Sequence, residues 1–312
     1  MMNKIAVIGS SNVDMIIKSA WIPKPGETVG NGIFAKVNGG KGTNQAVAAA
    51  RGGGNVVFIT CLGSDDFAPA MIKNFQKDHI DTQFVFVENN VSTGIALILV
   101  DDKGENCISV APGANYFLSL EHISKVETII KESEIILLQL EIPIDSVLYA
   151  IELAHKHGKK VVMNPAPAKK IDDKHMAMID SLVLNESEAE FLTGLPVTTD
   201  AQIREAAKAL LAKGPKNVVI TLGAKGAFVK NSDKDEFLPA FKVEAIDTTA
   251  AGDVYCGNLA VELVEGKSIF EAVKFASAAS AISVTRLGAQ PSAPSRNETI
   301  EFLKQSQHSF NN

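Results

Sequence analysis

Short apolar runs alternate with amphipathic helical segments through most of this chain, and this alternation is the feature that most restricts its fold. The apolar runs are rich in Val, Ile and Leu, and we expect strands at 4–9, 56–61, 135–140, 160–163, 181–184 and 217–222. Segments with helical periodicity lie at 42–51, 67–78, 120–131, 144–157, 186–193, 201–213, 254–264, 269–284 and 297–304. Continuous apolar strands are typical of a parallel sheet covered on both faces. The pattern therefore predicts an α/β fold with a doubly wound, mostly parallel sheet flanked by helices.

Two pairs of short strand-like segments interrupt the alternation, at 13–17 with 33–37 and at 93–100 with 106–110. Strands that follow one another without a crossover helix do not fit a parallel sheet. We expect them to form a small antiparallel β lid, built from segments near 13–37 and 93–111, over one end of a single domain spanning 1–312. One face of such a lid is apolar and must be shielded from water by substrate, by a partner subunit or by both. We therefore expect a homodimer joined through the lid.

The charge and the cysteines restrict the partners and the cellular compartment. The 312 residues carry a net charge of −6, and no basic stripe is present that could bind nucleic acid. The sequence shows no signal peptide and no apolar run of membrane length, so we expect no membrane association and a cytoplasmic location. Cys61, Cys107 and Cys256 are widely spaced, which favours reduced thiols.

A turn of small residues at 247–253 (Asp-Thr-Thr-Ala-Ala-Gly-Asp) precedes the expected amphipathic helix 254–264. Small residues let the backbone approach a ligand closely, and the helix directs free N–H groups and its positive dipole end to the same place. An anion is the natural occupant. Asp253 beside an anion indicates a base that takes a proton from an attacking hydroxyl, which points to phosphoryl transfer to an alcohol. The alternative for an isolated Gly-Asp pair is an ordinary helix N-cap.

A second glycine-rich turn, at 38–45 (Asn-Gly-Gly-Lys-Gly-Thr-Asn-Gln), also leads into a helix. It matches neither a P-loop nor a dinucleotide fingerprint. Its amide and ammonium side chains suit a ligand with many hydroxyl groups. Asn12 and Asp14 follow the first strand, where open α/β sheets bind ligands, and Glu141 ends a buried apolar run. Asp14 can accept hydrogen bonds from two neighbouring sugar hydroxyls, or it can simply cap the strand end.

Two further segments admit both a structural and a functional interpretation. Asn185 and Glu188 open a helix after a strand, where acidic groups complement the helix dipole. The same two side chains could order hydrated Mg²⁺ at nucleotide phosphates. The glycine turn at 221–226 is either a hairpin connection or a rim against which a nucleotide lies.

Taken in order, these elements resemble the ribokinase family, within the wider group of carbohydrate and nucleoside kinases. The matching segments are 9–14, 25–28, 39–46, 139–141, 164–168, 185–188, 247–253 and 285–292. They run from near residue 5 to beyond residue 292, which is essentially the whole chain. Collinear motifs in this number are far more specific than any one of them.

The resemblance implies ATP-dependent phosphorylation of D-ribose at its 5-hydroxyl, with ATP, Mg²⁺ and K⁺ as cofactors. It implies that Asp253 is the base and that the amides of Ala250, Ala251, Gly252 and Asp253 form the anion hole. The implied sugar contacts are Asn12, Asp14, Gly39, Gly40, Lys41, Gly42, Asn44, Glu141 and Asp253. The implied nucleotide contacts are Asn185, Glu188, Thr221, Leu222, Gly223, Ala224, Lys225, Gly226, Gly252, Asp253 and Ser277. The implied potassium site comprises Asp247, Thr249, Ser283, Arg286, Gly288 and Ser292.

The chain departs from the family pattern at few positions. Ala250 stands where glycine is frequent, and 254–256 (Val-Tyr-Cys) varies where Thr-Phe or similar is usual. Neither change removes a group that the mechanism needs. The alternatives are a kinase for 2-deoxyribose or for another small sugar or nucleoside, and a non-catalytic sugar-binding protein. Asp14 distinguishes the sugars only in part, because two vicinal hydroxyls would use it fully and one would not.

Overall fold

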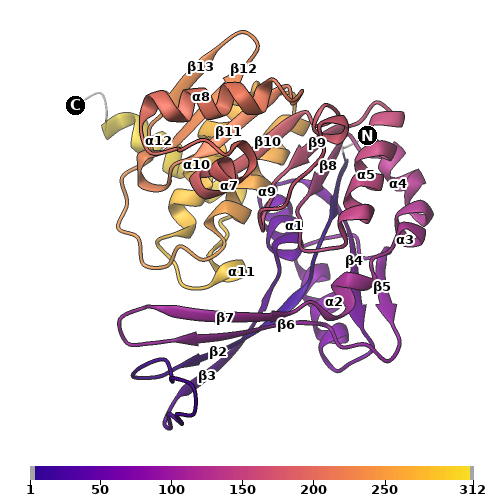
Figure 1. The fold of residues 1–312 in the computed structure, drawn as a ribbon, viewed down its shortest axis with the longest axis vertical. Coiled ribbons are helices and arrows are strands. Elements are labelled where there is room, and N and C mark those ends of the chain that lie inside the picture. Colours follow the sequence, from indigo (N-terminus) through magenta and orange to yellow (C-terminus); the bar gives the residue numbers. More distant parts are fainter. Residues whose placement is uncertain (1–3, 310–312) are drawn as a thin grey trace.

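The computed structural model describes residues 4–309, and it contains a large sheet and a small one (Figure 1). The large sheet has nine strands in the order β13-β12-β11-β10-β9-β8-β1-β4-β5. Their bounds are β1 Lys4–Ile8, β4 Asn55–Gly63, β5 Val85–Glu88, β8 Ile135–Leu138, β9 Lys160–Met163, β10 Ser181–Asn185, β11 Asn217–Thr221, β12 Ala227–Asn231 and β13 Asp235–Leu238. The strands from β11 to β5 are all parallel, and β12 and β13 add an antiparallel edge.

Helices cover both faces of the large sheet. One face carries α1 (Lys41–Arg51), α2 (Phe67–Lys77), α9 (Ala251–Val264) and α10 (Ile269–Ser283). The other carries α3 (Leu120–Lys125), α4 (Glu127–Glu132), α5 (Ile144–Lys156), α6 (Asp173–Met176), α7 (Glu186–Thr193) and α8 (Asp200–Leu211). The remaining short elements are η1 (Gly113–Phe117), η2 (Gly223–Lys225) and α11 (Ala289–Ser292), and α12 (Arg296–Ser309) packs against α10.

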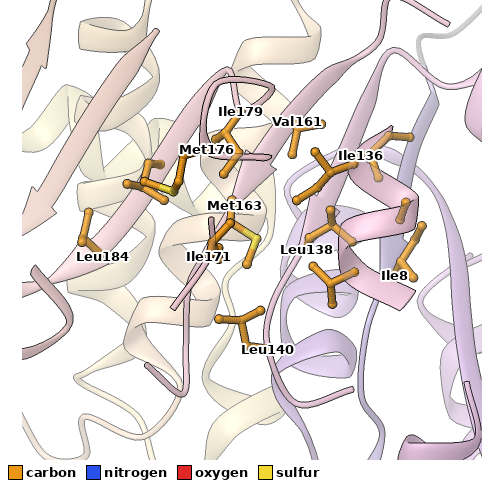
Figure 2. Packing of buried hydrophobic residues seen from close by; sticks show 14 of the residues in the cluster. Ile8, Ile136, Leu138, Leu140, Val161, Met163, Ile171, Met176, Ile179 and Leu184 are labelled. Atoms are coloured by element: carbon orange, nitrogen blue, oxygen red, sulfur yellow. The ribbon is translucent and has the colours of Figure 1, made fainter. Parts of the chain in front are cut away.

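The alternation of side chains along each strand divides the apolar core into two clusters. In β8, Ile135 and Leu137 pack with the face of α1 and α9, whereas Ile136 and Leu138 pack with the face of α5 (Figure 2). All four side chains are fully buried. This two-sided burial explains why the strands read as continuous apolar runs, and it confirms the doubly wound fold.

The lid is a separate four-stranded sheet that projects from one end of the main body (Figure 1). Its strands are β2 (Asn12–Lys18), β3 (Ile33–Gly39), β6 (Gly94–Val100) and β7 (Asn106–Ala111), in the order β3-β2-β6-β7. The two outer pairs are antiparallel as expected, but the central pair of β2 and β6 is parallel. The parallel pairing arises because both strands enter the lid at the same end, where Asn12 pairs with Gly94.

Several elements differ from the sequence expectations. The segment 120–131 forms two short helices that meet at Val126, instead of one helix. The helix α9, expected to be amphipathic, is buried on nearly all sides because it lies between α1 and α10. The short strand β5 and the edge strand β13 were not expected, whereas β12 pairs antiparallel with β11 across the turn 221–226, as the hairpin interpretation requires. Among the helices of residues 4–309, none is long and apolar enough to cross a membrane.

Candidate active site

The two glycine turns of the sequence meet at Asp253. The Asn44 Nδ2 atom donates a hydrogen bond of 3.1 Å to Asp253 Oδ2, and Gln45 Nε2 donates one of 3.0 Å to Asp253 Oδ1. Asn44 and Gln45 lie in the first turns of α1, and Asp253 lies in the first turn of α9. Asp253 is only 6% exposed. The carboxylate is therefore fixed at the junction of two helix N-termini.

Glycines allow α1 to begin directly against the segment 9–12. A Cβ atom on Gly42 would collide with the backbone of Gly9 and Ser10, and one on Gly40 would meet the backbone between Ser10 and Asn12. Gly40 also has a φ of +90°, which disfavours other residues. A close approach of backbone to backbone at this turn therefore requires glycine.

The Asp14 carboxylate lies against Gly39 and in the field of two other carboxylates. A Cβ atom at Gly39 would collide with the Asp14 side chain. Burial, together with the negative charges of Glu141 and Asp253, raises the pKa of Asp14 to about 6. Glu141 is held by hydrogen bonds to its Oε2 from Ser10 Oγ (2.5 Å) and from the Lys41 amide (3.0 Å).

Lys41 supplies the positive charge among these acids. Attraction to Asp253, and to a lesser degree to Glu141 and Glu188, raises the pKa of the buried Lys41 ammonium, although burial itself opposes the shift. On the lid side, Asn12 is 5% exposed, and its Oδ1 accepts a 2.7 Å hydrogen bond from Asn115 Nδ2. The expected sugar residues thus lie close to one another and to Asp253.

The start of α9 presents amides that can receive an anion. Ala250, the N-cap residue, has a φ of +59° and makes no capping side-chain hydrogen bond. The amides of Gly252 and Asp253 have no acceptor within the helix, as is general for a first turn. A Cβ atom on Gly252 would meet no protein atom within 4 Å among the described residues. The Ala251 amide differs from our expectation because it donates to Thr248 O at 3.2 Å and closes the turn.

A cavity of about 760 Å³ opens beside the start of α9. The expected nucleotide residues in its wall are Asn185, Thr221, Gly223, Ala224, Gly226, Gly252 and Ser277. Four other expected residues are not in the wall: Leu222 is buried in the core, and Glu188, Lys225 and Asp253 lie outside the lining. Sequence reasoning missed the loop 240–245, Tyr255, Ser280 and Val284, which also line the cavity. No motif marks that loop, although Tyr255 lies one helical turn beyond Gly252.

Asn185 and Glu188 bind each other at the start of α7. Asn185 Oδ1 accepts from the Glu188 amide at 2.8 Å, and Glu188 Oε2 accepts from the Asn185 amide at 2.9 Å. These two hydrogen bonds form a capping box, which leaves the second Glu188 oxygen available. Burial raises the pKa of Glu188, and nearby Lys41 opposes the shift.

The two segments expected to surround potassium lie side by side. Asp247 Oδ1 accepts from the Thr249 amide at 2.9 Å, and Asp247 Oδ2 accepts from the Gly288 amide at 2.8 Å. Burial opposes ionisation of Asp247, but the hydrogen bonds from Thr249 and Gly288 lower its pKa overall. The Ser283 carbonyl accepts from the Arg286 amide, and Ser292 Oγ donates to Ala289 O. In residues 4–306, no group of three His, Cys, Asp or Glu is placed to hold a metal, so a cation here would depend on one carboxylate with carbonyl and hydroxyl oxygens.

Comparison with known proteins decides the family. The model of the pfkB family of carbohydrate kinases matches residues 2–296. The chain belongs to the pfkB carbohydrate kinase family. The ribokinase of Haemophilus influenzae is 45% identical to this kinase over 304 residues, which cover 97% of this chain and 99% of the relative. The deoxyribokinase of Salmonella typhi is 42% identical over 300 residues, covering 96% and 98%.

Solved structures agree with the family assignment of this kinase. The ribokinase of Thermotoga maritima has a TM-score of 0.89 at 40% identity, covering 97% of this chain and all of the other. The Arabidopsis thaliana ribokinase in complex with ribose and ATP has a TM-score of 0.90 at 31% identity, covering 97% and 99%. These matches confirm the resemblance that the motifs indicated, and they confirm that the chain is an enzyme of the carbohydrate kinase type.

Proposed function

We propose that this carbohydrate kinase transfers the γ-phosphoryl group of ATP to the 5-hydroxyl of D-ribose, giving ribose 5-phosphate and ADP. The observation that carries the proposal is the position of Asp253. Its carboxylate lies between the acids and amides expected to hold the sugar and the amides of the α9 turn beside the 760 Å³ cavity. The names of the Haemophilus and Arabidopsis relatives support ribose as the substrate.

Asp253 acts as the base in this reaction. The sugar oxygen attacks the γ-phosphorus, the bond from that phosphorus to the β–γ bridging oxygen breaks, and the hydroxyl proton passes to Asp253. Because the transition state is loose, an ordinary carboxylate suffices to accept the proton late. The amides of Gly252 and Asp253 face the phosphoryl oxygens, and Lys41 adds positive charge beside them.

Asp14 orients the sugar by accepting hydrogen bonds from its hydroxyls. Asn12, Asn44 and Glu141 provide further donors and acceptors near Asp14 and Asp253. Residues 1–312 form one kinase domain in this proposal, and the lid from 13–37 and 93–111 excludes water, which would otherwise compete with the sugar hydroxyl.

Two cations complete the proposed site. Mg²⁺ would neutralise phosphate charge when bound. Asn185 and the Glu188 oxygen that the capping box leaves available would hold its hydration shell. K⁺ stabilises the anion-hole turn, and Asp247 would hold it together with oxygens of Thr249, Ser283, Arg286, Gly288 and Ser292. The amides of Thr249 and Gly288 that donate to Asp247 in the structure also fix the shape of this loop.

The lid supports a homodimer. Its large apolar side chains Ile33, Phe34, Leu97, Ile108 and Val110 are each more than half exposed. A second copy of the chain would cover them. The three free cysteines fit a reducing, cytoplasmic compartment.

A second candidate substrate is 2-deoxyribose. The deoxyribokinase of Salmonella typhi is 42% identical to this chain, close to the 45% of the Haemophilus influenzae ribokinase. The test is a coupled assay of ADP release with ribose, 2-deoxyribose, fructose and adenosine, each with and without K⁺. The proposal expects kcat/KM to be highest for ribose. A higher kcat/KM for 2-deoxyribose would favour the second candidate, and activity on adenosine alone would refute both.

A further inference from the structure

Three buried amide side chains behind Asp253 have no role in the mechanism above. They are Gln45, Gln139 and Asn164, with exposed fractions of 0%, 0% and 8%. Each belongs to a different motif of the sequence: the glycine turn 38–45, the segment 139–141 and the segment 164–168. Motifs that lie far apart in the chain therefore meet directly behind the catalytic carboxylate.

The hydrogen bonds among these side chains form a connected chain from Gln139 through Gln45 to Asp253 and Asn164, which we call the relay. Gln139 Nε2 donates to Gln45 Oε1 at 2.6 Å, and Gln45 Nε2 donates both to Asp253 Oδ1 at 3.0 Å and to Asn164 Oδ1 at 3.1 Å. Asn164 Nδ2 in turn donates to the Val183 carbonyl at 3.0 Å.

The relay allows only one orientation of the Gln45 amide. A backbone carbonyl can only accept, so Val183 O makes Asn164 present its oxygen to Gln45. Gln45 must then direct its NH₂ group toward both Asn164 and Asp253, and its oxygen toward Gln139. Reversing any one amide would place two donors or two acceptors face to face in a buried site, which is costly.

We propose that Gln45, Gln139 and Asn164 are positioning residues that fix the orientation of the Asp253 carboxylate. Gln45 saturates one lone pair of Oδ1 and Asn44 binds Oδ2, so the carboxylate cannot rotate away from the sugar hydroxyl. Only Gln45 touches Asp253, and the other two act through it.

Several charged or titratable groups also face Asp253, and a test must separate the relay from them. Lys41 attracts its charge, whereas Asp14 and Glu188 repel it and the Cys256 thiol lies buried beside it. None of these is altered when Gln45 or Gln139 is replaced. The inference rests on the proposed role of Asp253 as the base, so Asp253→Asn must be measured in parallel.

The decisive variant is Gln45→Glu, which keeps the size and shape of the side chain and places a second carboxylate against Asp253. Two carboxylates at hydrogen-bond distance resist simultaneous ionisation. We expect the acid limb of the kcat–pH profile to move upward by about one pH unit or more relative to the natural enzyme. An effect on folding alone would lower the melting temperature and leave the acid limb in place.

Gln139→Met tests the relay without any contact to Asp253. It removes the donor that fixes the Gln45 oxygen, and we expect kcat to fall about 3- to 10-fold, equivalent to one net hydrogen bond, with both KM values nearly unchanged. The matched control is Asn258→Leu. Like Gln139, the Asn258 side chain is a fully buried amide, but it lies in α9 and donates to the Val254 carbonyl, not to Asp253. This control should retain the natural kcat and pH profile.

The outcomes separate the two claims. An acid limb that does not move in Gln45→Glu, with Asp253→Asn inactive, overturns the relay and leaves the base intact. Near-normal turnover in Asp253→Asn refutes the base itself. Should Gln45→Glu fail to fold, the measurement on Gln139→Met decides, and an unchanged kcat there overturns the relay.

Discussion

The pKa of Asp14 makes sugar binding dependent on pH in the free enzyme. Burial and the charges of Glu141 and Asp253 raise this pKa to about 6, while Lys41 is the nearby positive charge. A protonated Asp14 loses one acceptor oxygen and offers a donor in its place, so it no longer matches two donating sugar hydroxyls. Acidification to pH 5 is therefore expected to weaken ribose binding before it unfolds the protein.

The magnitude follows from the titration curve. With a pKa of about 6, roughly 90% of Asp14 is ionised at pH 7 and roughly 10% at pH 5. If only the ionised form binds ribose well, the dissociation constant rises roughly 10-fold between pH 7 and pH 5. Asp14→Asn should bind ribose weakly at both pH values and show no such dependence.

Stability should change in the opposite sense to binding. The folded state holds the Asp14 proton up to about pH 6, whereas the unfolded chain releases it near its ordinary value of 3.8. Between these values the folded state binds more protons, so this residue lowers the free energy of unfolding as pH rises. Asp14→Asn should consequently stabilise the protein more at pH 7 than at pH 4.

The assay is titration calorimetry of ribose into the nucleotide-free enzyme from pH 5 to pH 8, at constant ionic strength. Omitting ATP avoids the titration of its own phosphates. Thermal unfolding of both proteins at pH 4 and pH 7 gives the second readout. A ribose affinity that stays constant from pH 5 to pH 7, or a pH dependence that persists in Asp14→Asn, would refute the reasoning.

Three further predictions concern the phosphate turn, the cation loop and the lid. Gly252→Ala should raise the KM for ATP about 10-fold or more, because the new methyl group projects where we expect phosphate to bind. The melting temperature should change little, since a Cβ atom at Gly252 meets no atom of the described residues within 4 Å. Gly42→Ala should instead lower the free energy of unfolding by about 1–3 kcal/mol, because its Cβ atom collides with backbone. Asp247→Asn should abolish the increase in melting temperature that KCl produces relative to equal NaCl, as read by scanning fluorimetry; an unchanged K⁺ response would exclude Asp247 as a ligand. Phe34→Lys should shift the protein from dimer to monomer in sedimentation velocity, and a natural protein that is already monomeric would disprove the lid interface.

Local sequence patterns were sufficient for the parallel core but not for the pairing of distant strands. Continuous apolar runs identify strands such as β8, since both faces of that strand are buried. The parallel pairing of β2 with β6 joins segments about 80 residues apart, and no local pattern encodes it. The edge strand β13 is half-buried and mixes acidic with apolar residues, and in β12 the buried apolar run is only 227–229, so both lack the longer apolar signal of the central strands.

The sequence predicted the site residues that stand in glycine turns. It did not predict the contacts that form only when distant segments pack together. Asp253 and Lys41 stand in turns whose composition already indicates ligand contact. Gln45 and Gln139 stand in two of the motifs, but no sequence pattern predicted their link to Asp253, because the hydrogen-bond relay exists only in the tertiary fold. The cavity wall at 240–243 and 245 carries no motif that marks it in the sequence.

Turnover of Asp253→Asn is the most direct test of the central claim that this carboxylate takes the proton. The substitution is tolerable in the fold, because Asn44 can turn its amide and accept from the new NH₂ group through an oxygen that has no partner among the described residues. We expect kcat to fall about 100-fold or more, with ribose and ATP dissociation constants within a few-fold of the natural enzyme. A kcat within about 10-fold of the natural enzyme would contradict the assignment of Asp253 as the base.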